Sequence, residues 1–211
     1  MRLGSYYRAR VMAHLGLKPQ GDHVLEVGAF DGYLVSKAEA TNKVGVDLDP
    51  ASSKVQHASI IRANGRSLPF RDSTFDAVLL MDVAEHEEND RELLCAVTKA
   101  LKPDGVLYMS VPSRSFVAFP PFITGALHRS WGHVRPGYTL EELTELFPQG
   151  MQVTIRQWNE PLFRFFYVPN WILWRTFLPT AKLMLRLAAL LDKRLSDGNH
   201  GHFFVKAQYK S

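Results

Sequence analysis

The fold of this chain is decided by VLEVGAFDG at residues 24–32, which VGVDLD follows at residues 44–49. Each string holds a short apolar run, as is typical of a parallel strand buried on both faces. The first run ends in a turn with Gly28 and Gly32, and the carboxylate of Glu26 lies just before it. A strand, a glycine turn, a helix and a second strand that ends in acid form a βαβ unit that holds a nucleotide.

The details of the turn favour a cationic nucleoside over a dinucleotide. The dinucleotide pattern G-x-G-x-x-G needs glycines where this chain has the bulky Phe30 and Tyr33. Asp31 adds a negative charge where a diphosphate would lie. S-adenosylmethionine has no phosphate and carries an ammonium and a sulfonium, so it suits this turn better.

The turn resembles motif I of the class I S-adenosylmethionine-dependent methyltransferases, usually written (D/E)-x-G-x-G-x-G. Glu26, Gly28 and Gly32 match the motif, and Phe30 replaces its central glycine, which leaves the path of the loop open. The resemblance implies S-adenosylmethionine as cofactor and S-adenosylhomocysteine as product. It also implies an α/β fold, a Rossmann-like seven-stranded sheet with helices on both faces and an antiparallel last strand between strands five and six.

Length and composition predict one soluble globular domain over residues 1–211. We expect an N-terminal helix within 1–20, a cofactor-binding half over 21–112, and an acceptor and lid half over 113–211 with an apolar insert at about 161–194. The first residues lack the apolar core of a signal peptide. The sequence contains no run of 18 apolar residues, so we expect no membrane-spanning helix.

Charge and cysteine content limit which binding partners and metal sites we expect. The formal charge of +4 forms no long basic run, so we expect no nucleic-acid partner. The single cysteine, Cys95, excludes a disulfide or a cysteine-based metal site within one chain and favours a reducing cytoplasm. We predict no metal site.

Apolar periodicity and turn residues predict alternating strands and helices, and hence a parallel sheet. The expected strands are 24–27, 44–47, 59–63, 77–81, 106–111, 151–157 and 202–209. The expected helices are 5–17, 33–40, one opened by Asp49 and Pro50, 90–101, and 139–147 behind a capping box at Thr139. Residues 102–105 are expected to form a turn.

In such sheets ligands bind beyond the carboxyl ends of the strands. Glu26 is placed to attract the methionine ammonium, and Asp47 to accept both ribose hydroxyls, with Asp49 a weaker candidate. The alternative is that Asp47 and Asp49 only cap the next helix. The predicted cofactor contacts are Glu26, Gly28, Ala29, Phe30, Gly32, Asp47, Leu48, Asn64, Gly65 and Asp82.

Two members of that set come from the resemblance. Related methyltransferases carry Asp-Ala before Leu-Pro-Phe, and that Asp meets the adenine amine; here Asn64 and Gly65 stand at those positions, or form a plain Asn-Gly turn. The segment from Val83 to His86 resembles the (V/L)-x-E-H segment of small-molecule methyltransferases, which places Asp82 beside the sulfonium and methionine.

The candidate catalytic bases are His86 and His133, because a histidine titrates near neutral pH and can take a proton from a nucleophile. Tyr138 and Trp131 are candidate substrate contacts in the segment after strand five. The alternatives are that His86 is a structural hydrogen bonder, and that His133 and Tyr138 only pin a lid loop.

The insert at about 161–194 combines tryptophans and leucines with Lys182, Arg186 and other cations. Three roles stay open: packing on the core or on a homodimer partner, a lid over an apolar acceptor, and contact with a membrane interface.

We therefore expect methyl transfer from S-adenosylmethionine to a small apolar or lipid-linked acceptor, at oxygen rather than nitrogen or carbon. The protein would be cytoplasmic, with peripheral membrane contact left open. The rivals are a non-catalytic binding protein with the same fold, a nicotinamide-dependent oxidoreductase and a nucleic-acid methyltransferase. Fold alone does not fix the acceptor.

Overall fold

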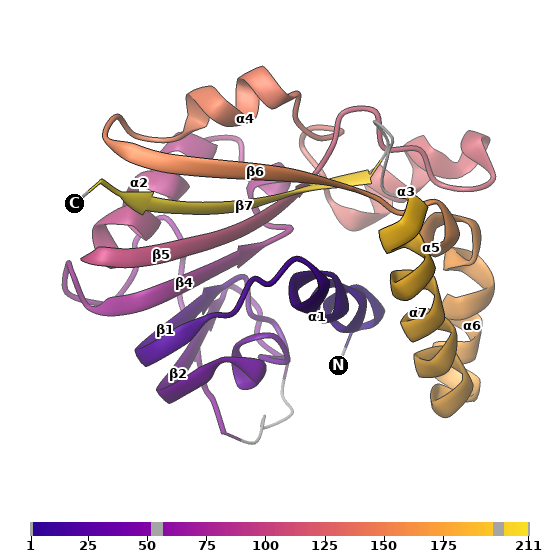
Figure 1. Cartoon of the computed structure of the whole chain (residues 1–211), viewed down its shortest axis with the longest axis horizontal. Coiled ribbons are helices and arrows are strands. Elements are labelled where there is room, and N and C mark those ends of the chain that lie inside the picture. The colour runs from indigo at the N-terminus through magenta and orange to yellow at the C-terminus, as the bar shows by residue number, and fades with distance from the viewer. Residues whose placement is uncertain (1, 52–56, 196–200, 211) are drawn as a thin grey trace.

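The computed structural model describes residues 2–51, 57–195 and 201–210, which form a single mixed sheet covered by helices (Figure 1). The strand order is β3-β2-β1-β4-β5-β7-β6, with β7 antiparallel to both of its neighbours. The strands are Gln20–Val27 (β1), Glu39–Asp47 (β2), Ser59–Arg62 (β3), Phe75–Met81 (β4), Leu101–Pro112 (β5), Met151–Asn159 (β6) and Gly201–Tyr209 (β7).

The order confirms the predicted seven-stranded sheet and the antiparallel last strand between β5 and β6. Strand order reverses between β1 and β4, because β1 pairs with β2 on one side and with β4 on the other. A ligand site is expected beyond the carboxyl ends of these two strands.

The helices divide between the two faces. Helices α2 and α4 pack on one face through Leu93, Leu94 and Leu143, while α1 and α7 pack on the other (Figure 1). The helices are Leu3–His14 (α1), Asp90–Ala100 (α2), Thr124–Trp131 (α3), Leu140–Leu146 (α4), Pro161–Phe165 (α5), Tyr167–Thr176 (α6) and Leu178–Asp192 (α7). The short turns are Val35–Lys37 (η1), Ala84–His86 (η2), Pro121–Ile123 (η3) and Lys193–Leu195 (η4).

Local signals placed two of these helices correctly. The Asn89 side chain accepts from the backbone N–H of Glu92 and begins α2. Thr139 and Glu142 form the predicted capping box: the Thr139 hydroxyl accepts from the Glu142 N–H, and the Glu142 carboxylate accepts from the Thr139 N–H. Both caps satisfy N–H groups that a helix leaves unpaired at its start.

The helix predicted at 33–40 is wrong, and chain length explains why. Strand β2 begins at Glu39, which pairs with Gln20, so residues 28–38 must return the chain along the whole of β1. Eight strand residues span about 23 Å, whereas eleven helical residues span only about 16 Å. The connection consists of turns and the short 3-10 turn η1 in place of an α-helix.

Two further predictions concern the turn at 102–105 and the helix after Asp49 and Pro50. The turn predicted at 102–105 belongs to β5, where the register with β4 shifts between Phe75 and Ala77. The helix predicted to open at Asp49 and Pro50 falls largely on residues 52–56, which lie outside the described residues.

Candidate functional site

The glycine turn after β1 is tightly packed against the loop after β4. Gly28 and Gly32 have φ values of +76° and +64°, a region that glycine enters without strain. A Cβ on Gly28 would lie 2.3 Å from Cγ2 of Val83, so a side chain there would clash. The N–H groups of Gly28 and of the buried Ala29 both donate to the Val46 carbonyl, which fixes the turn to the end of β2.

Asp47, at the end of β2, anchors the same turn. Its Oδ2 accepts from the N–H of Phe30 and its Oδ1 from the N–H of Asp49, both at 2.8 Å. Each carboxylate oxygen has a further lone pair, so Asp47 is pre-oriented to accept two ligand hydroxyls. Leu48 beside it is 60% exposed and offers an apolar surface at the same edge. Asp49 is exposed and pairs with Arg62, so the geometry favours Asp47 over Asp49.

Phe30 stands where the motif has its central glycine, with φ +42°. Its ring lies against the guanidinium of Arg2, whose carbon is 3.4 Å from the ring centroid. The ring is thus engaged by the residue that precedes α1. We conclude that the departure at Phe30 ties the turn to the N-terminal segment.

Glu26 is buried beneath the turn, and its Oε2 accepts from the N–H of Val35 at 2.8 Å. Burial raises the pKa of Glu26 to about 8, and the charges of Asp31 and Asp47 add to the effect, although the Val35 N–H opposes it. Without a cationic partner, Glu26 is therefore largely protonated at neutral pH.

Asn64 and Gly65 lie just beyond β3. The side-chain oxygen of Asn64 accepts from the N–H of Arg66, as in an Asx turn. A Cβ on Gly65 would lie 2.7 Å from Val27, so glycine is required by packing. The structure shows the turn role of Asn64, and its contact with adenine stays a prediction.

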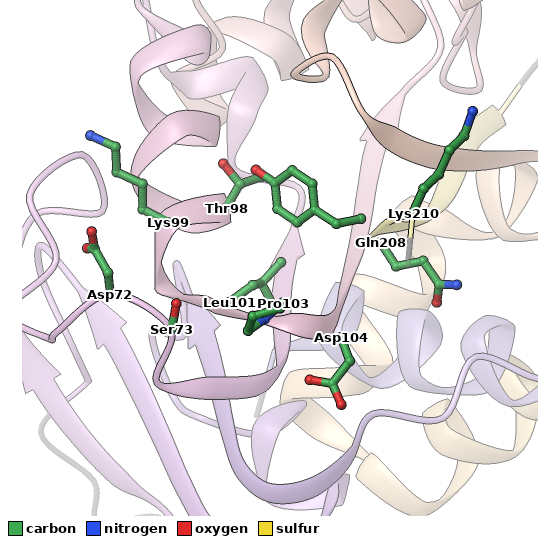
Figure 2. Close-up of a pocket in the computed structure, with 10 residues that line it drawn as sticks. Asp72, Ser73, Thr98, Lys99, Leu101, Pro103, Asp104, Gln208 and Lys210 are labelled. Carbon is green, nitrogen blue, oxygen red and sulfur yellow. The ribbon is translucent and has the colours of Figure 1, made fainter.

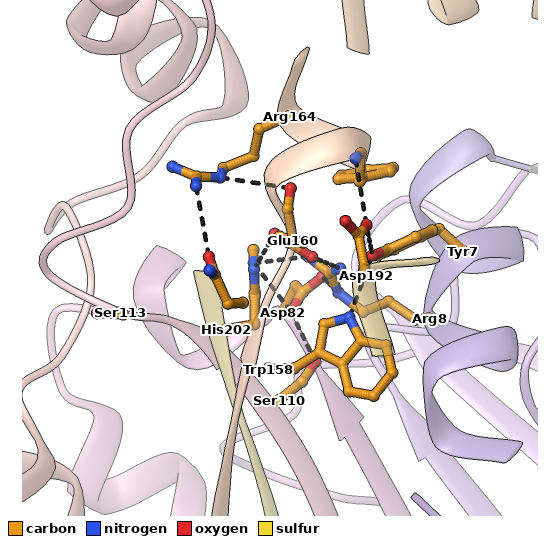
Figure 3. Close-up of polar contacts among 12 residues, drawn as sticks. Tyr7, Arg8, Asp82, Ser110, Ser113, Trp158, Glu160, Arg164, Asp192 and His202 are labelled. Atoms are coloured by element: carbon orange, nitrogen blue, oxygen red, sulfur yellow. Dashed lines mark hydrogen bonds and ion pairs between the residues drawn. The ribbon is translucent and has the colours of Figure 1, made fainter. Parts of the chain in front are cut away.

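Asp82 follows β4 and joins a buried polar cluster (Figure 3). It has φ +54°, and its carboxylate accepts from Arg8 Nε at 2.8 Å and from Ser110 Oγ at 2.6 Å. Arg8 is buried, and it also donates to Glu160 at 3.1 Å and lies 2.6 Å from His202 Nε2. Burial alone raises the pKa of Asp82, but the Arg8 guanidinium, helped by the Ser110 hydrogen bond, outweighs it and lowers the pKa to about 2.

The hydrogen bonds of His202 define the charge of this cluster. A guanidinium only donates, so Nε2 of His202 accepts from Arg8 and its Nδ1–H donates to Glu160, at 2.6 Å. One guanidinium then faces the carboxylates of Asp82 and Glu160. The cluster carries a net negative charge at the carboxyl end of β4, where a sulfonium would be stabilised.

A second group consists of imidazole and aromatic side chains. They lie in the loop after β4, in α3 and just after α3. The rings of His86 and His133 meet edge to face at 4.7 Å, and Nδ1 of His133 lies 2.8 Å from Nδ1 of His128. Trp131 stands 5.4 Å from His133 and 6.3 Å from Phe116, measured between ring centroids. The structure thus brings together the two candidate bases, His86 and His133, and the candidate substrate contact Trp131; their roles stay predictions.

The protonation of the two candidate bases follows from their contacts. Nδ1 of His86 lies 3.2 Å from the Gly132 carbonyl, which can only accept, so His86 carries a proton on Nδ1. In neutral His86, Nε2 then has a free lone pair. Burial, together with the nearby His86 and His128, lowers the pKa of His133 to about 4, so His133 is neutral at physiological pH.

Tyr138, predicted to contact the substrate, lies in the interior of the protein. It is 2% exposed, and its hydroxyl lies 2.8 Å from Asp90 and 3.1 Å from the Ala84 carbonyl. The structure places it in the alternative role, in which it pins the loop that carries His133 to η2.

Among the described residues, one group has the side chains of a metal site. The potential ligand atoms of Glu85, His86 and His133 lie within 4.8 Å of one another. Oε2 of Glu85 is buried with no hydrogen-bond partner, and burial raises the pKa of Glu85 well above its usual range. The sequence-based expectation of no metal stays a prediction.

A cavity lies away from this site. It has a volume of about 680 Å³ and opens at the opposite end of the central strands, between the start of β5 and the end of β7 (Figure 2). Its lining includes Asp72, Lys99, Asp104 and Lys210, and it shares no residue with the site at the strand carboxyl ends.

Sequence reasoning missed the Arg8 cluster. Arg8, Glu160 and His202 are far apart in the chain and match no spacing pattern. One available signal was Arg8 itself, a charged residue between Tyr7 and Val11, which α1 buries.

Comparison with known proteins agrees with this arrangement. Residues 25–109 match the family model described as a methyltransferase domain. An uncharacterized methyltransferase of Mycolicibacterium vanbaalenii is 32% identical over 104 residues, covering 45% of this chain and 41% of that protein. The mitochondrial ubiquinone biosynthesis O-methyltransferase of Schizosaccharomyces pombe is 33% identical over 127 residues, covering 51% and 44%. This chain thus spans less than half the length of either relative.

Among solved structures, the fold is similar to that of the Haemonchus contortus phosphoethanolamine N-methyltransferase 2 in complex with S-adenosyl-L-methionine. The TM-score is 0.65 at 17% identity, covering 95% of this chain and 51% of that one. At this identity the likeness shows the shared fold.

Proposed function

We propose that this chain is a class I S-adenosylmethionine-dependent methyltransferase that transfers a methyl group to a small apolar or lipid-linked acceptor, at oxygen. One observation carries the proposal. The anchored turn with Asp47 and the adjacent imidazoles of His86 and His133 all lie at the carboxyl ends of the central strands, so a cofactor half and an acceptor half share one end of the sheet.

The residues at the cofactor half fit the cofactor that the family implies. Asp47 has oriented oxygens for ribose hydroxyls, and Leu48 exposes an apolar surface for a base. Glu26 and ionised Asp82 supply negative charge for the ammonium and sulfonium. A diphosphate would meet all of these carboxylates, so a nicotinamide dinucleotide does not fit.

Bound S-adenosylmethionine supplies a methyl carbon that is already electrophilic. The chain's own residues then have to orient an acceptor, exclude water and, for a hydroxyl, remove a proton. Nε2 of His86 has the free lone pair for that proton, and neutral His133 lies beside it. The rings of Phe116, Trp131 and Tyr167 form an aromatic cluster next to these bases.

Two observations support oxygen as the methylated atom. A base is needed chiefly for a hydroxyl nucleophile, and the acceptor half offers two adjacent imidazoles, of which His133 is neutral. The S. pombe relative is named an O-methyltransferase. The mild charge and the absence of a basic run favour a small-molecule acceptor over nucleic acid, and the single cysteine suits a cytoplasmic protein.

The test combines binding and turnover. Calorimetry with S-adenosylhomocysteine should show binding that Asp47→Ala weakens a hundredfold or more, because two hydroxyl contacts to a charged group are lost. Asp49→Ala, the matched control, should bind like wild type. Labelled cofactor should methylate hydroxylated apolar acceptors. Unchanged affinity of Asp47→Ala would refute the ribose role.

The alternative is a binding protein of the same fold without catalysis, which the replaced glycine at Phe30 favours. It predicts cofactor binding of normal strength but no turnover with any acceptor in a metabolite or lipid extract. Binding together with turnover would reject it.

A further inference from the structure

Helices α6 and α7 expose an apolar outer surface, on the side away from α1. On α7, Leu183, Leu187 and Leu190 point to solvent, while Ala181 and Leu185 are buried. We define the outer face as the exposed large apolar side chains of α5 to α7: Phe165, Phe166, Val168, Trp171, Ile172, Phe177, Leu178, Leu183, Leu187, Leu190 and Leu191. Each of these side chains is between 37% and 59% exposed, and a concentration of large exposed apolar side chains marks an interaction surface.

The segment that carries this face is basic. From 161 to 195 its only acid is Asp192, which is buried and accepts from the Tyr7 hydroxyl and from two backbone N–H groups. Its cations are Arg164, Arg175, Lys182, Arg186, Lys193 and Arg194. No exposed carboxylate in the segment balances them.

Trp171 and Arg175 show how the apolar and charged groups combine. The guanidinium carbon of Arg175 lies 3.7 Å from the centroid of the Trp171 ring, and Trp171 is 45% exposed. A tryptophan with a guanidinium on its face is apolar on one side and charged on the other, which suits the boundary between lipid chains and headgroups.

Charge also decides between the two occupants that could cover this face. In a two-fold homodimer the same surface would meet itself, so Arg175 on Trp171 would face its own copy, whereas Lys182 and Arg186 lie against Tyr6 on the side of α1. An anionic bilayer supplies the opposite charge together with hydrocarbon. Among the described residues no helix is long and apolar enough to cross a bilayer, so the contact would lie in the interface plane.

We propose that the outer face of α6 and α7 docks on an anionic lipid surface. The face continues to the acceptor half, because Phe119 meets Phe165 at 4.6 Å and Tyr167 meets Trp131 at 5.7 Å. Phe122, in the same loop as Phe119, is 85% exposed. Docking would bring the aromatic cluster to the membrane, where a lipid-linked acceptor is found; this last step rests on the proposed function.

The test is co-sedimentation of the full chain with vesicles of phosphatidylcholine alone or with roughly one-third phosphatidylglycerol. We expect binding to the anionic vesicles, lost at high salt. The double variant Leu183→Glu, Leu187→Glu should bind at least tenfold more weakly. Leu140→Glu, which changes an equally exposed leucine of α4, is the matched control and should bind normally. Lys193→Gln with Arg194→Gln should weaken binding roughly thirtyfold, at about fivefold per cation.

The other outcomes overturn the proposal. Equal binding to neutral vesicles would reject the charge argument. A dimer in light scattering that Leu183→Glu, Leu187→Glu dissociates, without vesicle binding, would assign the face to a second copy. A monomer that binds no vesicle would reject docking altogether. Methyl transfer to a water-soluble phenol should persist in the double variant, so its absence in wild type would count against the proposed function alone.

Discussion

The two halves of the site differ in how they are held. In the cofactor half, backbone N–H groups and carboxyl groups fix each other, as at Asp47 and the buried Glu26. In the acceptor half, His86, Trp131 and His133 touch mainly through their rings. Under the proposed function, the first arrangement would hold one cofactor rigidly, and the second would offer an adaptable surface to an acceptor.

Removing the guanidinium of Arg8, which contacts Asp82, Glu160 and His202, should cause the largest loss of stability. Arg8→Met leaves Asp82 and Glu160 buried without their cation, so we expect a loss of about 3–5 kcal/mol in the free energy of unfolding. Arg91→Met, on the exposed side of α2, should change little. Urea unfolding measures the free energy of unfolding of both variants. Equal losses would mean that the Arg8 cluster contributes no more to stability than an exposed arginine.

The rigidity of the cofactor half can be tested at Gly28. Gly28→Ala should cost about 2–4 kcal/mol, from left-handed backbone strain and from the clash with Val83. Gly150→Ala has the same positive φ with nothing within 4 Å and isolates the strain. Adding Val83→Ala to Gly28→Ala should restore part of the loss; if it restores none, the close contact is not what makes the turn rigid.

The acceptor half should respond in rate and keep its stability. His86→Gln should lower kcat about a hundredfold with an alcohol acceptor, because the base is gone. With an acidic phenol, which ionises unaided, the loss should be small. His23→Gln, in the first half of β1 and away from the carboxyl ends of the strands, is the control. Equal losses for both acceptors would assign His86 a structural role.

Glu26 gives an effect that depends on pH. Its pKa is about 8 in the fold, against an ordinary 4.5, so the carboxyl favours the folded state below pH 4.5 and that contribution is lost as pH rises through 8. Glu26→Gln stays neutral, so its free energy of unfolding should exceed that of wild type by up to about 5 kcal/mol above pH 8 and match it at pH 4. Unfolding curves at the two pH values test this, and a constant difference would contradict the raised pKa.

Cofactor binding should report the same group. A bound ammonium favours ionised Glu26, so binding at pH 7 should release a proton in wild type and less in Glu26→Gln. Calorimetry in two buffers of different ionisation enthalpy measures the release.

The strands could be predicted from sequence because each depends on a local apolar run, as at Ala77–Met81. The helix expected at 33–40 could not, since its absence follows from the length of β1 and its register with β2. The role of Asp47 was accessible because it ends a strand. The Arg8 cluster was not, because it depends on how α1 docks against segments some 150 to 190 residues away, at Glu160 and His202.

The position of β7 has a consequence for the order of folding. Its residues, 201–209, pair with β5 on one side and β6 on the other, and they follow all three insert helices in the chain. While the chain emerges from a ribosome, β5 therefore waits with one edge unpaired and β6 without any strand partner, and the β5-β7-β6 end of the sheet closes last. Such late long-range pairing slows folding and leaves open edges that other chains can join, so overexpression at reduced temperature should raise the soluble yield.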